Sequence, residues 1–80
     1  MKANVYVTLK AEVLDPQGEA VRRALDSLGF AGVKRVRVGK LIEIDLDATE
    51  AKDAQVKLRA MCEKLLANAV IEDFDFELEG

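Results

Sequence analysis

The chain has 80 residues, 50% of them apolar and 34% charged, which is the balance of one soluble globular domain spanning residues 1–80, near the lower size limit for a self-sufficient core. Its net charge of −3 argues against a nucleic-acid binder, whose affinity rests on Lys and Arg that neutralise phosphates. Histidine is absent and Cys62 is the single cysteine, so we expect no catalytic, metal-binding or cofactor-binding residue in this chain.

The N-terminal third predicts a strand followed by a helix. Apolar residues alternate from Val5 to Val13, the period of a half-buried strand. In "LDPQGEAVRRALDSLGF" the period changes to that of a helix, with Asp15 as its N-cap and Pro16 at the first helical position. One face of this helix carries an apolar stripe of Ala20, Val21, Ala24, Leu25 and Leu28.

Two glycines stand out around this helix. Gly29 suits a left-handed helix stop, with Phe30 folding back onto the last turn. Gly18 lies inside the helix, where glycine costs about 1 kcal/mol relative to alanine. We therefore expect Gly18 to mark a place where a backbone or a partner protein approaches closely.

The stretch "VKRVRVGKLIEIDLD" predicts a β-hairpin. If both arms turn their apolar residues to the core, Val38 lies opposite Ile42 and residues 39–41 form a three-residue connection. Lys40 is then a charge at the tip of a loop. The same register places Arg37 opposite Glu43 and Arg35 opposite Asp45.

A second helix is predicted from about Glu50 to Ala67, with Thr49 as its N-cap and Asn68 as a left-handed terminator. Its apolar stripe comprises Ala51, Ala54, Leu58, Met61 and Leu65.

A final strand is predicted where apolar and acidic residues alternate. Its apolar positions are Phe74, Phe76 and Leu78, and its acidic positions are Asp73, Asp75, Glu77 and Glu79.

The predicted order of elements is β-α-β-β-α-β, which defines the fold class as α+β. In so short a chain this order favours a four-stranded antiparallel sheet with both helices on one face, a ferredoxin-like variant. The other face is expected to be acidic, through Glu43, Asp45, Asp73, Asp75, Glu77 and Glu79.

Structural interpretations are favoured over reactive ones at each candidate site. The basic run 34–40 is interpreted as a paired, solvated strand rather than an anion site. Cys62 belongs to an apolar helix face and is interpreted as a small buried hydrophobe. A phosphate at the helix start would be repelled by Asp15 and Glu19. Glu72 and Asp73 point to opposite faces of a strand and cannot act as an acid–base pair.

The expected location is the cytoplasm. A lone cysteine forms no internal disulfide, which suits a reducing compartment. The N-terminus "MKANVYVTLK" alternates polar and apolar residues, unlike a signal peptide, and no stretch is long enough to span a membrane.

Three strings carry a resemblance to a known family: "VYVTLKAEVLDPQGEAVRRALDSLGF", "VRVGKLIEIDL" and "MCEKLLANAVIEDFDFE". Together they closely resemble the PurS family, the small subunits of bacterial and archaeal phosphoribosylformylglycinamidine (FGAM) synthase, over almost the whole chain. Ala69 departs from the family, in which proline is frequent after the asparagine.

The resemblance implies a role without catalysis. The multi-subunit ligase converts formylglycinamide ribonucleotide (FGAR), ATP, glutamine and water to FGAM, ADP, phosphate and glutamate in purine biosynthesis. A PurL-type synthetase subunit carries the ATP and Mg²⁺ chemistry, and a PurQ-type glutaminase subunit releases ammonia. The small subunit bridges the two so that ammonia passes between them.

The candidate functional residues are therefore positions where a partner protein could dock. A small core with open sheet edges also favours a homodimer or tetramer. Two alternatives stay open: an acylphosphatase-like enzyme, which would need an arginine-bearing phosphate cradle, and an ACT-like regulatory domain that binds a small molecule. The candidate interface residues are Asp15, Pro16, Gln17, Gly18, Gly39, Lys40, Phe74 and Phe76.

Overall fold

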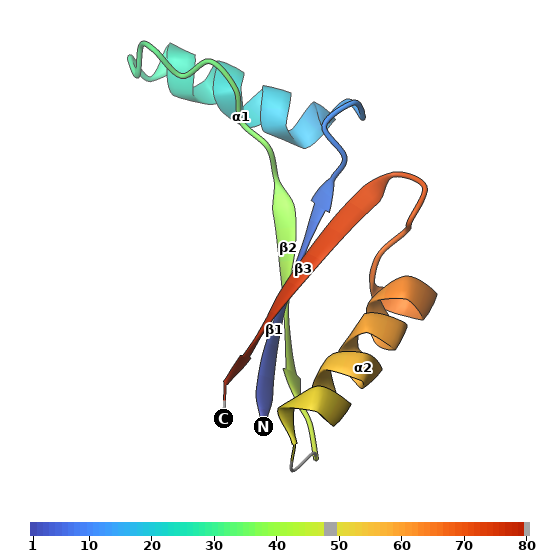
Figure 1. The fold of residues 1–80 in the computed structure, drawn as a ribbon. Coiled ribbons are helices and arrows are strands. Elements are labelled where there is room, and N and C mark those ends of the chain that lie inside the picture. Colours follow the sequence, from blue (N-terminus) through green and yellow to red (C-terminus); the bar gives the residue numbers. More distant parts are fainter. Residues whose placement is uncertain (48–49, 80) are drawn as a thin grey trace.

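Three antiparallel strands form the centre of the computed structural model, which describes residues 1–47 and 50–79 (Figure 1). The strand order is β2-β1-β3, so β1 is central and β2 and β3 are the edges. The α+β class is confirmed, with the order β-α-β-α-β in the described residues. The elements are β1 (Lys2–Leu9), α1 (Pro16–Ser27), β2 (Gly39–Asp45), α2 (Ala51–Met61), a π-helical turn η1 (Cys62–Leu66) and β3 (Glu72–Glu79).

The core lies between the inner face of the sheet and α2. Alternate residues of β1, namely Ala3, Val5 and Val7, are at most 1% exposed and pack with Leu58 and Cys62 of the α2–η1 unit. The alternation in β1 therefore serves the inner face as expected. The strand starts earlier and ends earlier than predicted, because the chain turns after Leu9, where the N–H of Val13 donates to the Lys10 carbonyl (2.9 Å).

The predicted hairpin is wrong. Residues 33–38 are not a strand, and β2 runs without a turn through Gly39, Lys40 and Leu41. Gly39 pairs with Thr8 and Lys40 pairs with Val7, so the expected loop is part of the ladder with β1. The physical reason is that the Asp15 carboxylate accepts the Val38 N–H (2.7 Å) and holds the segment before β2 beside α1, so residues 39–41 continue the ladder with β1 instead of turning back.

The predicted arginine pairs are also absent from the described residues. The Nη2 atom of Arg37 donates to the Lys10 carbonyl (2.9 Å), and that of Arg35 donates to the Ala11 carbonyl (3.3 Å). Glu43 instead lies 3.8 Å from the Lys2 ammonium. Without the hairpin, the two guanidinium groups donate to carbonyls of the loop that follows β1.

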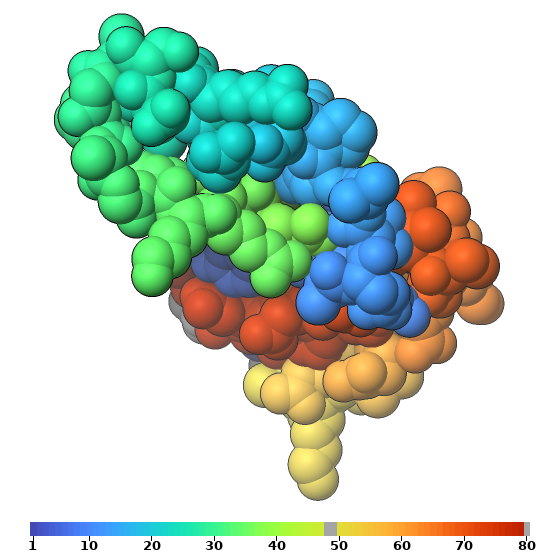
Figure 2. All heavy atoms as spheres, turned by 90° about the horizontal axis from the view of Figure 1, so that it is seen from above, coloured from blue at the N-terminus to red at the C-terminus, as the bar shows by residue number. Residues whose placement is uncertain are grey.

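The two helices do not share one face of the sheet. The α2–η1 unit covers the inner face, whereas α1 extends beyond the end of the strands and has at most marginal contact with the other described helices and strands (Figures 1 and 2). The radius of gyration is 16.0 Å, against about 12 Å for a compact 80-residue domain. The chain is elongated because one of its helices has no sheet beneath it.

The helix predictions near α1 are confirmed. Asp15 caps the helix by accepting the Gly18 N–H, and Pro16 occupies the first turn. Gly29 has a positive φ of 94°, and the Phe30 N–H reaches back to the Leu25 carbonyl (3.0 Å). The Phe30 side chain, however, is 58% exposed.

The end of the second helix differs from the prediction. In η1 the Ala67 N–H bonds the Cys62 carbonyl (3.0 Å), and this wider turn rotates the following residues, so Leu65 is 83% exposed. Asn68 is not left-handed; its side chain instead accepts the Val70 N–H (3.1 Å). Thr49, the predicted N-cap, lies outside the described residues.

Candidate assembly surfaces

The start of α1 is tied to the segment before β2 by Asp15. One carboxylate oxygen accepts the Gly18 N–H (2.9 Å) and the other accepts the Val38 N–H (2.7 Å). The Val38 bond first, and the Gly18 bond second, lower the pKa of Asp15. Asp15 is buried, so it acts here as an internal brace between two segments.

At Gly18, α1 lies close against the backbone of that segment. A Cβ atom at Gly18 would lie 2.1 Å from the Val36 carbonyl oxygen and 2.9 Å from an Asp15 carboxylate oxygen. The expectation that a backbone approaches Gly18 is confirmed, and the backbone is the chain's own. Glycine is therefore required here without any partner.

The structure brings two of the predicted interface patches together. Gln17 from α1 and Gly39 and Lys40 from β2 line one hollow of about 170 Å³, which Asp15 and Glu72 also border. Gln17, Gly39 and Lys40 are exposed. The separate helix start and hairpin tip expected from the sequence are thus one continuous surface.

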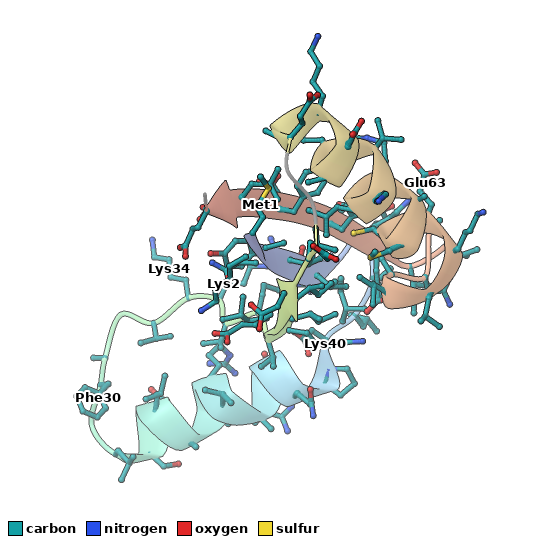
Figure 3. All side chains as sticks on the ribbon, turned by 90° about the horizontal axis from the view of Figure 1, so that it is seen from below. Met1, Lys2, Phe30, Lys34, Lys40 and Glu63 are labelled. Atoms are coloured by element: carbon teal, nitrogen blue, oxygen red, sulfur yellow. The ribbon has the colours of Figure 1, made fainter. Side chains whose placement is uncertain are left out.

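Lys40, whose side chain is labelled in Figure 3, is not free in this surface, because its ammonium lies 3.5 Å from Glu72. Sequence reasoning considered Glu72 only as a possible acid–base partner of Asp73 and did not place it at this surface. Its side chain is 12% exposed and accepts the Asn68 N–H (2.7 Å). This hydrogen bond first, and then Lys40, lower the pKa of Glu72. Glu72 links the start of β2 to the turn before β3.

Phe74 and Phe76 belong to a different surface. They are half-buried on the inner face of β3, and the Arg59 guanidinium lies 5.9 Å and 5.8 Å from their ring centres. With Cys62 they line a hollow of about 740 Å³ between β3 and the α2–η1 unit. Arg59 was missed; its place directly after the buried Leu58 is the signal that would have suggested it.

The apolar stripe of α1 is open to solvent. Ala20, Val21 and Ala24 are exposed, and Leu28 is 73% exposed. Leu14, in the loop before the helix, is 88% exposed. Several exposed apolar side chains on one helix favour an interaction site.

The outer face of the sheet is acidic, as predicted. All six expected carboxylates are exposed, and Tyr6 and Leu41 lie beside each other among them, 38% and 55% exposed. The negative charge of Glu77 first, and burial second, raise the pKa of Tyr6.

The described residues contain neither a membrane-spanning helix nor a cluster of metal ligands. No helix within residues 1–47 and 50–79 is long and apolar enough to cross a membrane. In the same ranges, no three His, Cys, Asp or Glu side chains gather as metal ligands would.

The chain is a small α+β domain with two open sheet edges and an exposed apolar helix stripe, features that are typical of protein interaction surfaces. The comparisons name the family. The family described as "PurS: Phosphoribosylformylglycinamidine (FGAM) synthase" matches residues 2–80. The chain belongs to the PurS family, the small subunits of FGAM synthase, a ligase complex of purine biosynthesis.

Relatives agree along their whole length. The PurS subunit of Bacillus subtilis (strain 168) is 50% identical over 78 residues, covering 98% of this chain and 92% of that protein. A crystal structure of B. subtilis PurS is similar with a TM-score of 0.86 and 49% identity, over 99% of this chain and 98% of that one. Methanocaldococcus jannaschii PurS gives a TM-score of 0.88 at 41% identity, over 98% and 94%.

A third similar structure is described as a PurLQS structure. It is the PurLQS structure from Thermotoga maritima, with a TM-score of 0.87 at 32% identity, over 95% of this chain and 93% of that chain.

Proposed function

We propose that this chain is a non-catalytic assembly subunit that bridges a PurL-type synthetase and a PurQ-type glutaminase, so that ammonia released from glutamine reaches the synthetase. Membership of the PurS family supports the proposal, as does the T. maritima relative, which is described within a PurLQS structure. The reaction served is the conversion of FGAR, ATP, glutamine and water to FGAM, ADP, phosphate and glutamate.

The observation that carries this proposal is the unfinished packing of the chain. An apolar helix stripe with Leu28 73% exposed and two unpaired sheet edges are costly in water and become useful only at an interface. We therefore also propose that the chain forms a homodimer or tetramer with itself. The ATP and Mg²⁺ of the reaction are assigned to the synthetase, and no cofactor is assigned to this chain.

Co-purification of the three separately expressed proteins tests the bridging role. The synthetase and glutaminase subunits are expected to elute together from a size-exclusion column only when this chain is present. Stable association of the two large subunits without it would contradict the proposal. An ACT-like domain would instead bind a small molecule and leave both subunits unbound.

A further inference from the structure

The edge of β3 that faces away from β1 has no partner strand in the described part of the chain. The Lys10 N–H donates to the Ile71 carbonyl (2.8 Å), and the register continues from there with even residues of β1 opposite odd residues of β3. The odd residues of β3 therefore turn their N–H and C=O groups toward β1. The backbone groups of the even residues, Phe74, Phe76 and Leu78, face the open edge.

A groove runs along this open edge, between β3 and the α2–η1 unit, which lie beside each other in Figure 1. It consists of two hollows, of about 740 and 520 Å³, which share four lining residues: Arg59, Glu63, Asp75 and Phe76. Phe74 adds apolar surface to the first hollow, and Val56 and Ala60 add it to the second. We call the two hollows together the β3 groove. Every second side chain of a strand added to the open edge would lie over this apolar surface.

The outer face of β3 carries only negative charge. Its four exposed side chains are Asp73, Asp75, Glu77 and Glu79. No ion pair among the described residues involves any of these four carboxylates. Lys2 of β1 is opposite Glu79 in the register, yet its ammonium lies 3.8 Å from Glu43. Basic side chains on an added strand would therefore meet carboxylates that have no cation of their own.

We propose that the open edge of β3 receives an extended segment of a partner protein as a fourth, antiparallel strand, in which apolar residues alternate with lysine or arginine. This inference rests on the bridging function proposed above and names the chemistry that would hold a large subunit. The apolar residues lie opposite Phe74, Phe76 and Leu78 and point into the β3 groove. The basic residues lie opposite Asp75 and Glu77, at non-hydrogen-bonded positions, where opposing side chains are closest. Main-chain hydrogen bonds give an added strand its affinity, and its alternate side chains give it specificity.

The charges favour this occupant over two others. A second copy of β3 would place carboxylates directly opposite carboxylates, and like charges in that position are destabilising. A small anion would meet four carboxylates in the first hollow alone, against two cations, Lys10 and Arg59. The guanidinium of Arg59 already lies 5.9 and 5.8 Å from the ring centres of Phe74 and Phe76. A strand that is apolar on one face and basic on the other fits both sides of the edge.

Two peptides of equal composition and charge test the alternation. The first is Lys-Val-Arg-Val-Lys-Val-Arg and the second is Val-Val-Val-Lys-Arg-Lys-Arg, each acetylated and amidated at its ends. The alternating peptide is expected to bind the natural chain roughly 10-fold more tightly, because it alone reaches the groove and the carboxylates in one extended conformation. Fluorescence anisotropy of labelled peptides measures both affinities.

Methyl groups on the backbone nitrogens of the alternating peptide test the strand itself. In an antiparallel pair the valine N–H groups point toward β3, whereas those of the basic residues point away from it. Methylating the three valine nitrogens is expected to weaken binding at least about 10-fold, because three hydrogen bonds are lost. Methylating the nitrogens of three basic residues is the matched control and should leave the affinity nearly unchanged.

A charge reversal tests whether the site is at β3 and whether a large subunit uses it. Asp75→Lys is expected to weaken binding of the alternating peptide roughly 3- to 10-fold. Glu43→Lys makes the same change of charge on β2, at the other edge of the sheet, and should bind like the natural chain. In co-purification of the three proteins, Asp75→Lys should retain less of a large subunit than Glu43→Lys does. Circular dichroism checks that both variants are folded.

Three outcomes would overturn the inference: equal binding of the two peptides, equal effects of the two methylation patterns, or equal assembly by the two variants. The first would show unspecific charge attraction, and the second would show a docking mode other than strand addition. The third would show that the large subunits do not use this edge. Failure of the bridging role is seen separately, because the natural chain would then not join the two large subunits, whatever the peptides do.

Discussion

Asp15 shows how far a single residue can be predicted from sequence. Its position before Pro16 is enough to predict an N-cap, because capping depends only on residues next to it in the chain. Its second hydrogen bond, to the Val38 N–H at 2.7 Å, joins residues 23 positions apart. No local pattern specifies that contact, so the brace was visible only in the structure.

Lowering the pH should reduce the stability that the Asp15 brace contributes. Hydrogen bonds lower the pKa of Asp15 in the folded chain, so its contribution to stability is present above the ordinary pKa of an aspartate and is lost as pH falls through the lowered value. Urea unfolding at a series of acidic pH values should show a steeper loss for the natural chain than for Asp15→Asn, which is less stable near neutral pH. Equal slopes for both proteins would contradict the role of the carboxylate.

Gly18→Ala is expected to destabilise the folded chain by roughly 1–3 kcal/mol, although alanine is the better helix former. The reason is the Val36 carbonyl oxygen, 2.1 Å from the position a Cβ would take, because a backbone atom cannot move aside alone. Thermal unfolding by circular dichroism measures the loss. Gln17→Ala, at an exposed neighbour, is the control and should change stability by at most about 0.5 kcal/mol. An unchanged Gly18→Ala would mean that α1 shifts freely over the segment.

At the scale of elements, periodicity predicted three strands and two helices correctly, but it also predicted a strand in residues 33–38, which the structure does not contain. The alternation in β1 and β3 and the caps of α1 are local and were predicted correctly. The stripe residue Leu65 was misplaced because the π-helical turn changes the number of residues per turn. The hairpin failed for a different reason: Arg37 and Glu43 are complementary by parity and charge, yet no local pattern shows that Arg37 instead donates to the distant Lys10 carbonyl.

Variants of two leucines distinguish packing inside the chain from packing against another chain. Leu58 is fully buried under the sheet, whereas Leu28 on α1 is 73% exposed. Leu58→Ala is expected to cost about 2–5 kcal/mol of stability. Leu28→Ala should leave helix content unchanged yet weaken self-association or binding to the large subunits, as sedimentation velocity can measure. If Leu28→Ala changes neither, the α1 stripe is not an interface.

At the scale of the whole molecule, the elongated shape suits the proposed assembly role. A chain with a radius of gyration of 16.0 Å devotes one helix and two sheet edges to surfaces that other chains can cover. The eight candidate interface residues form two groups: the helix start with the first residues of β2, and the two phenylalanines under Arg59. Their docking roles stay predictions, because exposure and shape do not name the subunit that each group contacts.

The central claim is that this chain assembles the enzyme without taking part in its chemistry. The most direct test compares glutamine-dependent with ammonia-dependent FGAM synthesis by the two large subunits, each with and without this chain. We predict that adding the chain strongly raises the glutamine-dependent rate and leaves the ammonia-dependent rate nearly unchanged, because the synthetase active site lies in another protein. A glutamine-dependent rate that is the same with and without the chain would contradict the claim.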